Sequence, residues 1–167
     1  MARYYEFFEV KVEGTKKNVD SICEAVKGFS DYCDIEKKKN VIRISDLCKI
    51  ADEKDAEEFA KFVAHAANGA NFTMEGSTEC SVSGECMAFF VELNNGVLTM
   101  RNSVWHYTHS SEWFEDFETY EEYCDECGDD IASEEDFQIA KENDLVYIID
   151  GKVYTEVPFG EAIVIEY

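Results

Sequence analysis

The chain has 167 residues, of which 46% are hydrophobic and 14% aromatic, enough to bury a core as one domain or two small ones. Fifteen basic against thirty-seven acidic residues give a formal net charge of −22 at pH 7. Residues 81–167 hold 21 of the acidic residues and 3 of the basic ones. This anionic section disfavours nucleic acid and anionic membranes as partners and favours cationic ones. A salt-adapted surface is a competing explanation, which the twelve lysines make less attractive.

The N-terminal sequence MARYYEFFEVKVEG alternates and carries charge, so we expect no secretory signal. No stretch of the sequence has the length and apolarity of a transmembrane helix. Seven cysteines are an odd number, which without an export signal favours reduced thiols. We therefore expect a cytoplasmic protein.

The first part of the chain alternates between strand and helix patterns. Apolar residues recur at every second position in the expected strands and at helical spacing in the expected helices. The predicted elements are a strand (3–13), a helix (15–29), a hairpin that turns at Lys39-Asn40 (32–47), a helix (52–67) and a short strand (71–75). The order β-α-β-β-α-β predicts a ferredoxin-like unit over residues 1–78 within an α+β fold.

A stretch rich in Gly and Ser, residues 76–84, predicts a boundary between two sections. We expect residues 84–167 to form a smaller acidic section of antiparallel strands with one or two helices. Asn95-Gly96 and Asp150-Gly151 are strong hairpin signals. Ser133 is expected to cap a short helix that ends near Asn143, and residues 162–167 form a last strand.

Between Glu112 and Asp136 the sequence holds thirteen acidic residues and no Lys or Arg. Its apolar side chains follow one another at steps of 4, 3, 4 and 3, which predicts one continuous amphipathic helix over residues 112–127 with Ser110 or Ser111 as its N-cap. The eight acids from Glu112 to Glu126 would then lie along about 21 Å of helix axis. This charge spacing is of the same order as the ~3.4 Å between phosphates in a DNA strand. The members of the apolar stripe are Trp113, Phe117, Tyr120, Cys124 and Cys127, with Phe114 and Tyr123 beside them.

Cys124 and Cys127 form a C-x2-C sequence of the kind found in zinc knuckles. Cys80 with Cys86 would be the remaining zinc ligands, or alternatively the two histidines at 106 and 109. Because the C-x2-C lies on the apolar stripe, buried thiols without a metal are the competing interpretation, and we expect no cofactor.

Motifs for catalysis are not found in the sequence. It has no G-x-S-x-G elbow, no phosphate-binding glycine loop and no D-x-[DN]-x-[DN]-G calcium loop. Pairs of carboxylates on so acidic a helix have almost no specificity as hydrolase sites. We therefore expect a protein that is not an enzyme.

The preferred hypothesis is a binding or inhibitor protein whose acidic face, about residues 112–136, engages a basic, nucleic-acid-binding surface of a partner protein, such as a nuclease. Small acidic phage and mobile-element proteins that block restriction or CRISPR nucleases are similar to it in size, charge and lack of catalytic motifs. The alternatives are an acidic cytosolic domain of another role and a small zinc-binding protein, and a homodimer is open in each case. The expected partner-binding residues are Glu112, Glu115, Asp116, Glu118, Glu121, Glu122, Asp125, Glu126, Asp129, Asp130, Glu134 and Glu135.

Overall fold

The computed structural model describes residues 4–81, 85–105, 108–110, 114–127 and 131–167. The chain divides into two compact units, the first formed by residues 1–103 with 159–167 and the second by residues 104–158. The elements of the first unit are β1 (Tyr4–Glu13), α1 (Lys16–Phe29), β2 (Asp34–Lys38), β3 (Val41–Ser45), α2 (Glu53–Ala66), β4 (Asn71–Cys80), β5 (Cys86–Asn94), β6 (Val97–Trp105) and β10 (Ile163–Ile165).

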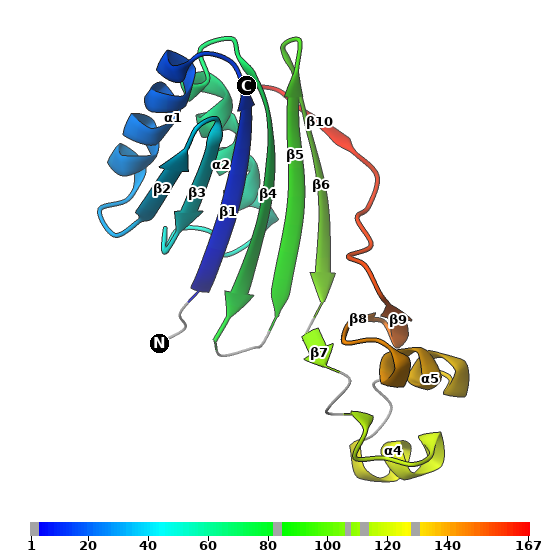
Figure 1. Cartoon of the computed structure of the whole chain (residues 1–167). Helices are drawn as coiled ribbons and strands as arrows, with labels where there is room; N and C mark the ends of the chain where they lie inside the picture. Colours follow the sequence, from blue (N-terminus) through cyan, green and yellow to red (C-terminus); the bar gives the residue numbers. More distant parts are fainter. Residues whose placement is uncertain (1–3, 82–84, 106–107, 111–113, 128–130) are drawn as a thin grey trace. The chain divides into compact units, whose positions relative to one another are not determined.

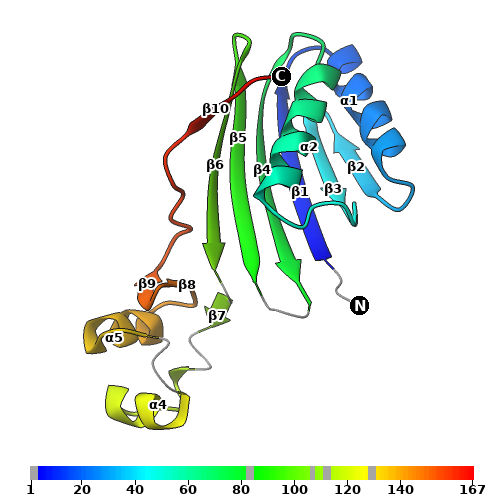
Figure 2. The same ribbon diagram turned by 180° about the vertical axis from the view of Figure 1, so that it is seen from behind.

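The fold is α+β, and the strand pairs described in it are antiparallel. Within the described residues the first unit forms a seven-stranded sheet with the order β10-β6-β5-β4-β1-β3-β2. Helices α1 and α2 lie on one face of this sheet, as the two opposite views in Figures 1 and 2 show. The predicted element order over the first 78 residues is therefore observed, and the β2–β3 hairpin turns at Lys39-Asn40 as expected.

The stretch predicted as a boundary, residues 76–84, begins inside β4 of this sheet. β4 runs past the expected end at Glu75 to Cys80, and it pairs with β5 from Phe72 opposite Leu93 to Glu79 opposite Cys86. Gly76 lies inside this strand. A glycine suits this position because the rings of Phe8 and Phe89, on the neighbouring strands, occupy the space that a side chain would need.

The core of the first unit lies between the sheet and the two helices. Alternate residues of β1 point into it, and Phe8, Val10 and Val12 are buried there. Capping fixes where each helix begins: the side chain of Thr15 accepts a hydrogen bond from the backbone N–H of Asn18, and Asp52 does the same for α2. No helix within the described residues is both long and apolar enough to cross a bilayer.

Glu6 is a charged residue buried among the apolar side chains of β1, with 4% of its surface exposed. Its carboxylate accepts hydrogen bonds from the backbone N–H groups of Lys49 at 3.0 Å, Ile50 at 2.7 Å and Cys48. Burial raises the pKa of Glu6, and the three N–H donors offset part of this effect. Through these hydrogen bonds, Glu6 of β1 holds the loop between β3 and α2 in place.

Candidate protein-binding surface

The second unit has a small aromatic core of its own. Its elements are β7 (Thr108–Ser110), α4 (Tyr120–Cys127), α5 (Glu134–Glu142), β8 (Leu145–Ile149) and β9 (Lys152–Tyr154), and the strands pair in the order β7-β8-β9. The ring of Tyr123 is fully buried and lies 5.3 Å from that of Phe137, centroid to centroid. The core is completed by Phe114, Phe117, Ile131, Ala140, Val146 and Val153.

The predicted helix over residues 112–127 is wrong in its extent, because α4 begins only at Tyr120. Thr119 caps the start of α4, because its side-chain oxygen accepts a hydrogen bond from the backbone N–H of Glu122 at 3.1 Å. The carboxylate of Glu122 reaches back and accepts from the backbone N–H of Glu118 at 2.9 Å. The Thr119-x-x-Glu122 sequence is the capping signal that could have placed this start. Residues 115–119 are not helical, so the comparison with evenly spaced phosphates does not apply along them.

Within α4, the amphipathic pattern is the one predicted. Tyr123 is buried and Tyr120, Cys124 and Cys127 are partly buried against the core, while the acids occupy the opposite face. Glu112, Asp129 and Asp130 lie outside the described residues. The other nine predicted partner-binding residues are all exposed; they are Glu115, Asp116, Glu118, Glu121, Glu122, Asp125, Glu126, Glu134 and Glu135.

Helix α5 brings two of these acids, Glu134 and Glu135, into its first turn. Its N-cap is Ser133, as predicted, whose hydroxyl accepts from the backbone N–H of Asp136 at 3.1 Å. The carboxylate of Asp136 in turn accepts from the Ser133 hydroxyl at 2.6 Å and from the backbone N–H of Val153 at 3.2 Å. Asp136 therefore stabilises the unit, whereas Glu134 and Glu135 point to solvent.

The two helices are fixed to each other through the core, so their acids belong to one folded unit. The hydroxyl of Tyr120 in α4 donates to the carbonyl of Ile131, just before α5, at 2.7 Å. The rings of Tyr120 and Phe137 lie 5.9 Å apart. We call the nine exposed acids of residues 115–135 the acidic surface.

Among the residues that the structure describes, no lysine or arginine forms an ion pair with the acidic surface. Residues 104–158 contain seventeen acidic residues and two lysines, Lys141 and Lys152, a net charge of −15. Every ion pair found among the described residues lies in the first unit. Lys141 donates instead to the carbonyl of Phe117 at 2.7 Å, and Lys152 lies over the ring of Tyr154.

This arrangement puts like charges close together on a short helix. The pairs Glu121–Asp125 and Glu122–Glu126 have i,i+4 spacing, and each opposes the helix by about 0.2–0.5 kcal/mol. Asp125 and Glu126 also lie in the last turn of α4, which contains no basic residue, next to the negative end of the helix dipole. A cation docked against this face would remove both penalties.

The four cysteines of the zinc hypothesis are divided between the two units: Cys80 and Cys86 lie in the first, Cys124 and Cys127 in the second. Burial and the neighbouring Glu79 and Glu85 raise the pKa of the Cys86 thiol to about 11, whereas zinc binds the thiolate. In the part of the chain that the structure describes, no three Cys, His, Asp or Glu side chains come together as a metal site.

Comparison of the chain with protein-family models, with curated proteins and with solved structures finds no match.

Proposed function

We propose that this protein acts by binding, with the acidic surface of its second unit engaging a basic, nucleic-acid-binding surface of a partner protein. The observation that carries the proposal is the combination of nine exposed carboxylates with a packed aromatic core beneath them. A disordered acidic segment would have to be ordered on binding, and that cost lowers its affinity. Here Tyr120, Tyr123 and Phe137 hold the helices in place beforehand.

Electrostatics supports this type of partner. An anionic surface attracts a cationic groove over roughly a Debye length, about 8 Å at physiological salt, and raises the association rate. The partner's cations would also relieve the repulsion along α4. A nuclease or another protein with a basic groove for nucleic acid offers this complementarity, so the proposal includes inhibition by competition with the nucleic acid.

A ferredoxin-like arrangement of the first six elements is part of the proposal. The order β4-β1-β3-β2 with antiparallel pairing supports it. Strands β5, β6 and β10 extend the sheet beyond that unit. Because this fold hosts many unrelated activities, we assign partner binding to the acidic surface and not to the fold.

The proposal is tested with a panel of purified basic nucleases and DNA-binding proteins, measuring whether the protein displaces a labelled DNA duplex from each. We expect displacement from at least one of them, with an affinity that falls at least about tenfold between 50 and 200 mM salt. The test variant replaces Glu115, Glu118, Glu121 and Glu126 by Gln, which spares Glu122 because its carboxylate caps α4.

The matched control places the same charge change in the first unit. Glu13→Gln, Asp31→Asn, Glu58→Gln and Glu161→Gln remove four exposed acids there. We expect the test variant to lose most of its affinity and the control to keep most of it. Equal losses in the two would mean that net charge alone attracts the partner, and unchanged affinity of the test variant would contradict the proposal.

A further inference from the structure

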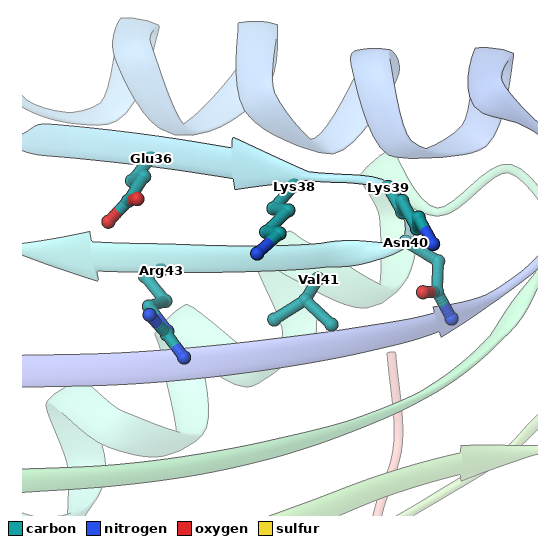
Figure 3. A pocket seen from close by; sticks show the side chains of 6 residues that line it. All are labelled: Glu36, Lys38, Lys39, Asn40, Val41 and Arg43. Atoms are coloured by element: carbon teal, nitrogen blue, oxygen red, sulfur yellow. The ribbon is translucent and has the colours of Figure 1, made fainter.

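The hairpin formed by β2 and β3 carries a hollow of about 250 Å³ (Figure 3). Three of its lining residues are cationic and one is a carboxylate, so the lining carries a formal charge of +2 in a chain whose net charge is −22. The carboxylate of Glu9, which pairs with Arg43, lies beside it. The complete lining is Glu36, Lys38, Lys39, Asn40, Val41 and Arg43. None of these residues takes part in the acidic surface, which belongs to the other unit.

Strand alternation decides which side chains of the hairpin reach the hollow. Ile42 and Ile44 of β3 are buried in the core beneath the helices, so Val41 and Arg43 lie on the other face of the sheet. Lys38 is the cross-strand neighbour of Val41, and Glu36 is that of Arg43, which places both on the same face as the hollow.

The three consecutive lysines therefore have different roles. Lys37 lies on the helix-covered face, where its ammonium binds the carboxylate of Asp20 on α1 together with Lys16. Hydrogen bonds from these two lysines lower the pKa of Asp20 to about 2. Lys38 and Lys39, by contrast, form no ion pair with any residue that the structure describes.

The hollow is anchored to the rest of the sheet. The side-chain amide of Asn40 donates to the carbonyl of Val12 at 3.2 Å, and the N–H of Val12 donates to the carbonyl of Asn40 at 2.9 Å. Arg43 donates from Nε to the carboxylate of Glu9 at 3.1 Å, which fixes one edge of its guanidinium. Hydrogen bonds thus fix the turn to β1 and fix the guanidinium of Arg43. The two lysine side chains supply two further ammonium groups.

We propose that this hollow binds the phosphate group of a small phosphomonoester that carries hydroxyl groups. Two ammonium groups and a guanidinium suit a doubly charged anion with several acceptor oxygens. The volume is below the ~300–1,000 Å³ of pockets for drug-sized ligands, so the ligand is small. Glu36 repels a second anionic group and can accept a hydrogen bond from a ligand hydroxyl, which disfavours an extended polyanion.

The test uses the full chain labelled with ¹⁵N, in a buffer without phosphate and at constant ionic strength. Ribose 5-phosphate, ribose, inorganic phosphate and a short single-stranded oligothymidylate are added in separate titrations. We expect ribose 5-phosphate to shift the backbone amide signals of residues 36–43 and to saturate with a Kd of about 0.1–1 mM. Ribose should cause no shift, and inorganic phosphate should bind several-fold more weakly than the sugar phosphate.

The variant Lys38→Gln with Lys39→Gln removes both ammonium groups of the hollow and should weaken this binding at least about tenfold, which corresponds to ~1.4 kcal/mol. The matched control is Lys17→Gln with Lys54→Gln, which removes the same charge at two exposed positions outside the hollow and should bind as the unchanged chain does. Spectra that superimpose on that of the unchanged chain, apart from signals near the substituted residues, show that both variants are folded.

Three outcomes would overturn the proposal: no saturable shift with ribose 5-phosphate, equal weakening in the two double variants, or binding of the oligothymidylate alone. The last result would assign the cations to a nucleic-acid strand instead of a small phosphomonoester.

Discussion

The side chain of Lys141 in α5 donates a hydrogen bond to the backbone carbonyl of Phe117, 2.7 Å away in the turn before α4. Its ammonium also lies 5.6 Å from the centre of the Phe137 ring. One of the two lysines among residues 104–158 is thus used to hold the turn and not to pair with a carboxylate.

Replacing Lys141 by Met tests this role. Met keeps the apolar contact with the ring but loses the donor to the Phe117 carbonyl, so the free energy of unfolding of the second unit should fall by about 1–2 kcal/mol. Urea unfolding followed by NMR signals of that unit measures the change. Lys152→Met removes the same charge without such a hydrogen bond and should stay within ~0.5 kcal/mol. Equal losses in the two variants would show that charge, and not this contact, governs the effect.

The last turn of α4 should show a conflict between stability and binding. Asp125→Asn with Glu126→Gln removes two acids beside the negative end of the helix dipole and should raise the free energy of unfolding by about 0.5–1 kcal/mol. The same double variant should bind the proposed basic partner more weakly. Chemical denaturation and the DNA-displacement assay measure the two effects.

The control for that variant removes two acids from the N-terminal end of α5, another helix of the same unit. Glu134→Gln with Glu135→Gln removes two acids from the first turn of α5, where the dipole favours them, and should lower the free energy of unfolding by a similar amount. If both double variants were stabilised, relief of the overall negative charge would be the explanation instead of the dipole.

Gly76 should tolerate no side chain. A Cβ there would come within 2.4 Å of Phe8 and 2.6 Å of Phe89, two rings whose centroids are 5.3 Å apart in the core. Gly76→Ala should therefore lower the free energy of unfolding by about 1–3 kcal/mol. Gly28→Ala, in α1 with open space around the new Cβ, should raise it by about 0.5–1 kcal/mol. A neutral Gly76→Ala would mean that the two rings can separate without cost.

Glu6 should titrate above its ordinary pKa of 4.5, as a ¹³C titration of its carboxyl group would measure. Because the folded state then holds the proton more tightly than the unfolded state, the contribution of Glu6 to the free energy of unfolding is largest in acid. It falls as the pH rises from about 4.5 through the folded-state pKa. The free energy of unfolding of the chain, minus that of Glu6→Gln, should shrink across this window. A difference that grows with pH would contradict the raised pKa.

The turns and the element types of this chain could be predicted because their causes are local. Asn95 and Gly96 both adopt positive φ, at 50° and 82°, as do Asp150 and Gly151, and these residue pairs favour that conformation wherever they occur. The apolar spacing of α4 likewise predicted which of its side chains face the core. The start of that helix was missed because the same spacing continues back into residues 115–119, which are not helical, whereas Thr119 caps α4.

The sequence by itself predicted the order of the elements over residues 1–78, the hairpin turns, the N-cap of α5 and the concentration of acids in the second half. Only the tertiary structure decided that β4 continues into the Gly- and Ser-rich stretch and pairs there with β5. The glycine at position 76 is explained by rings from two other strands, which fill the space of a side chain. It also separated the roles of Lys37 and Lys38, since alternation assigns them to opposite faces but only the packing of α1 shows which face is covered. Such outcomes depend on contacts between residues distant in the chain, which no local pattern records.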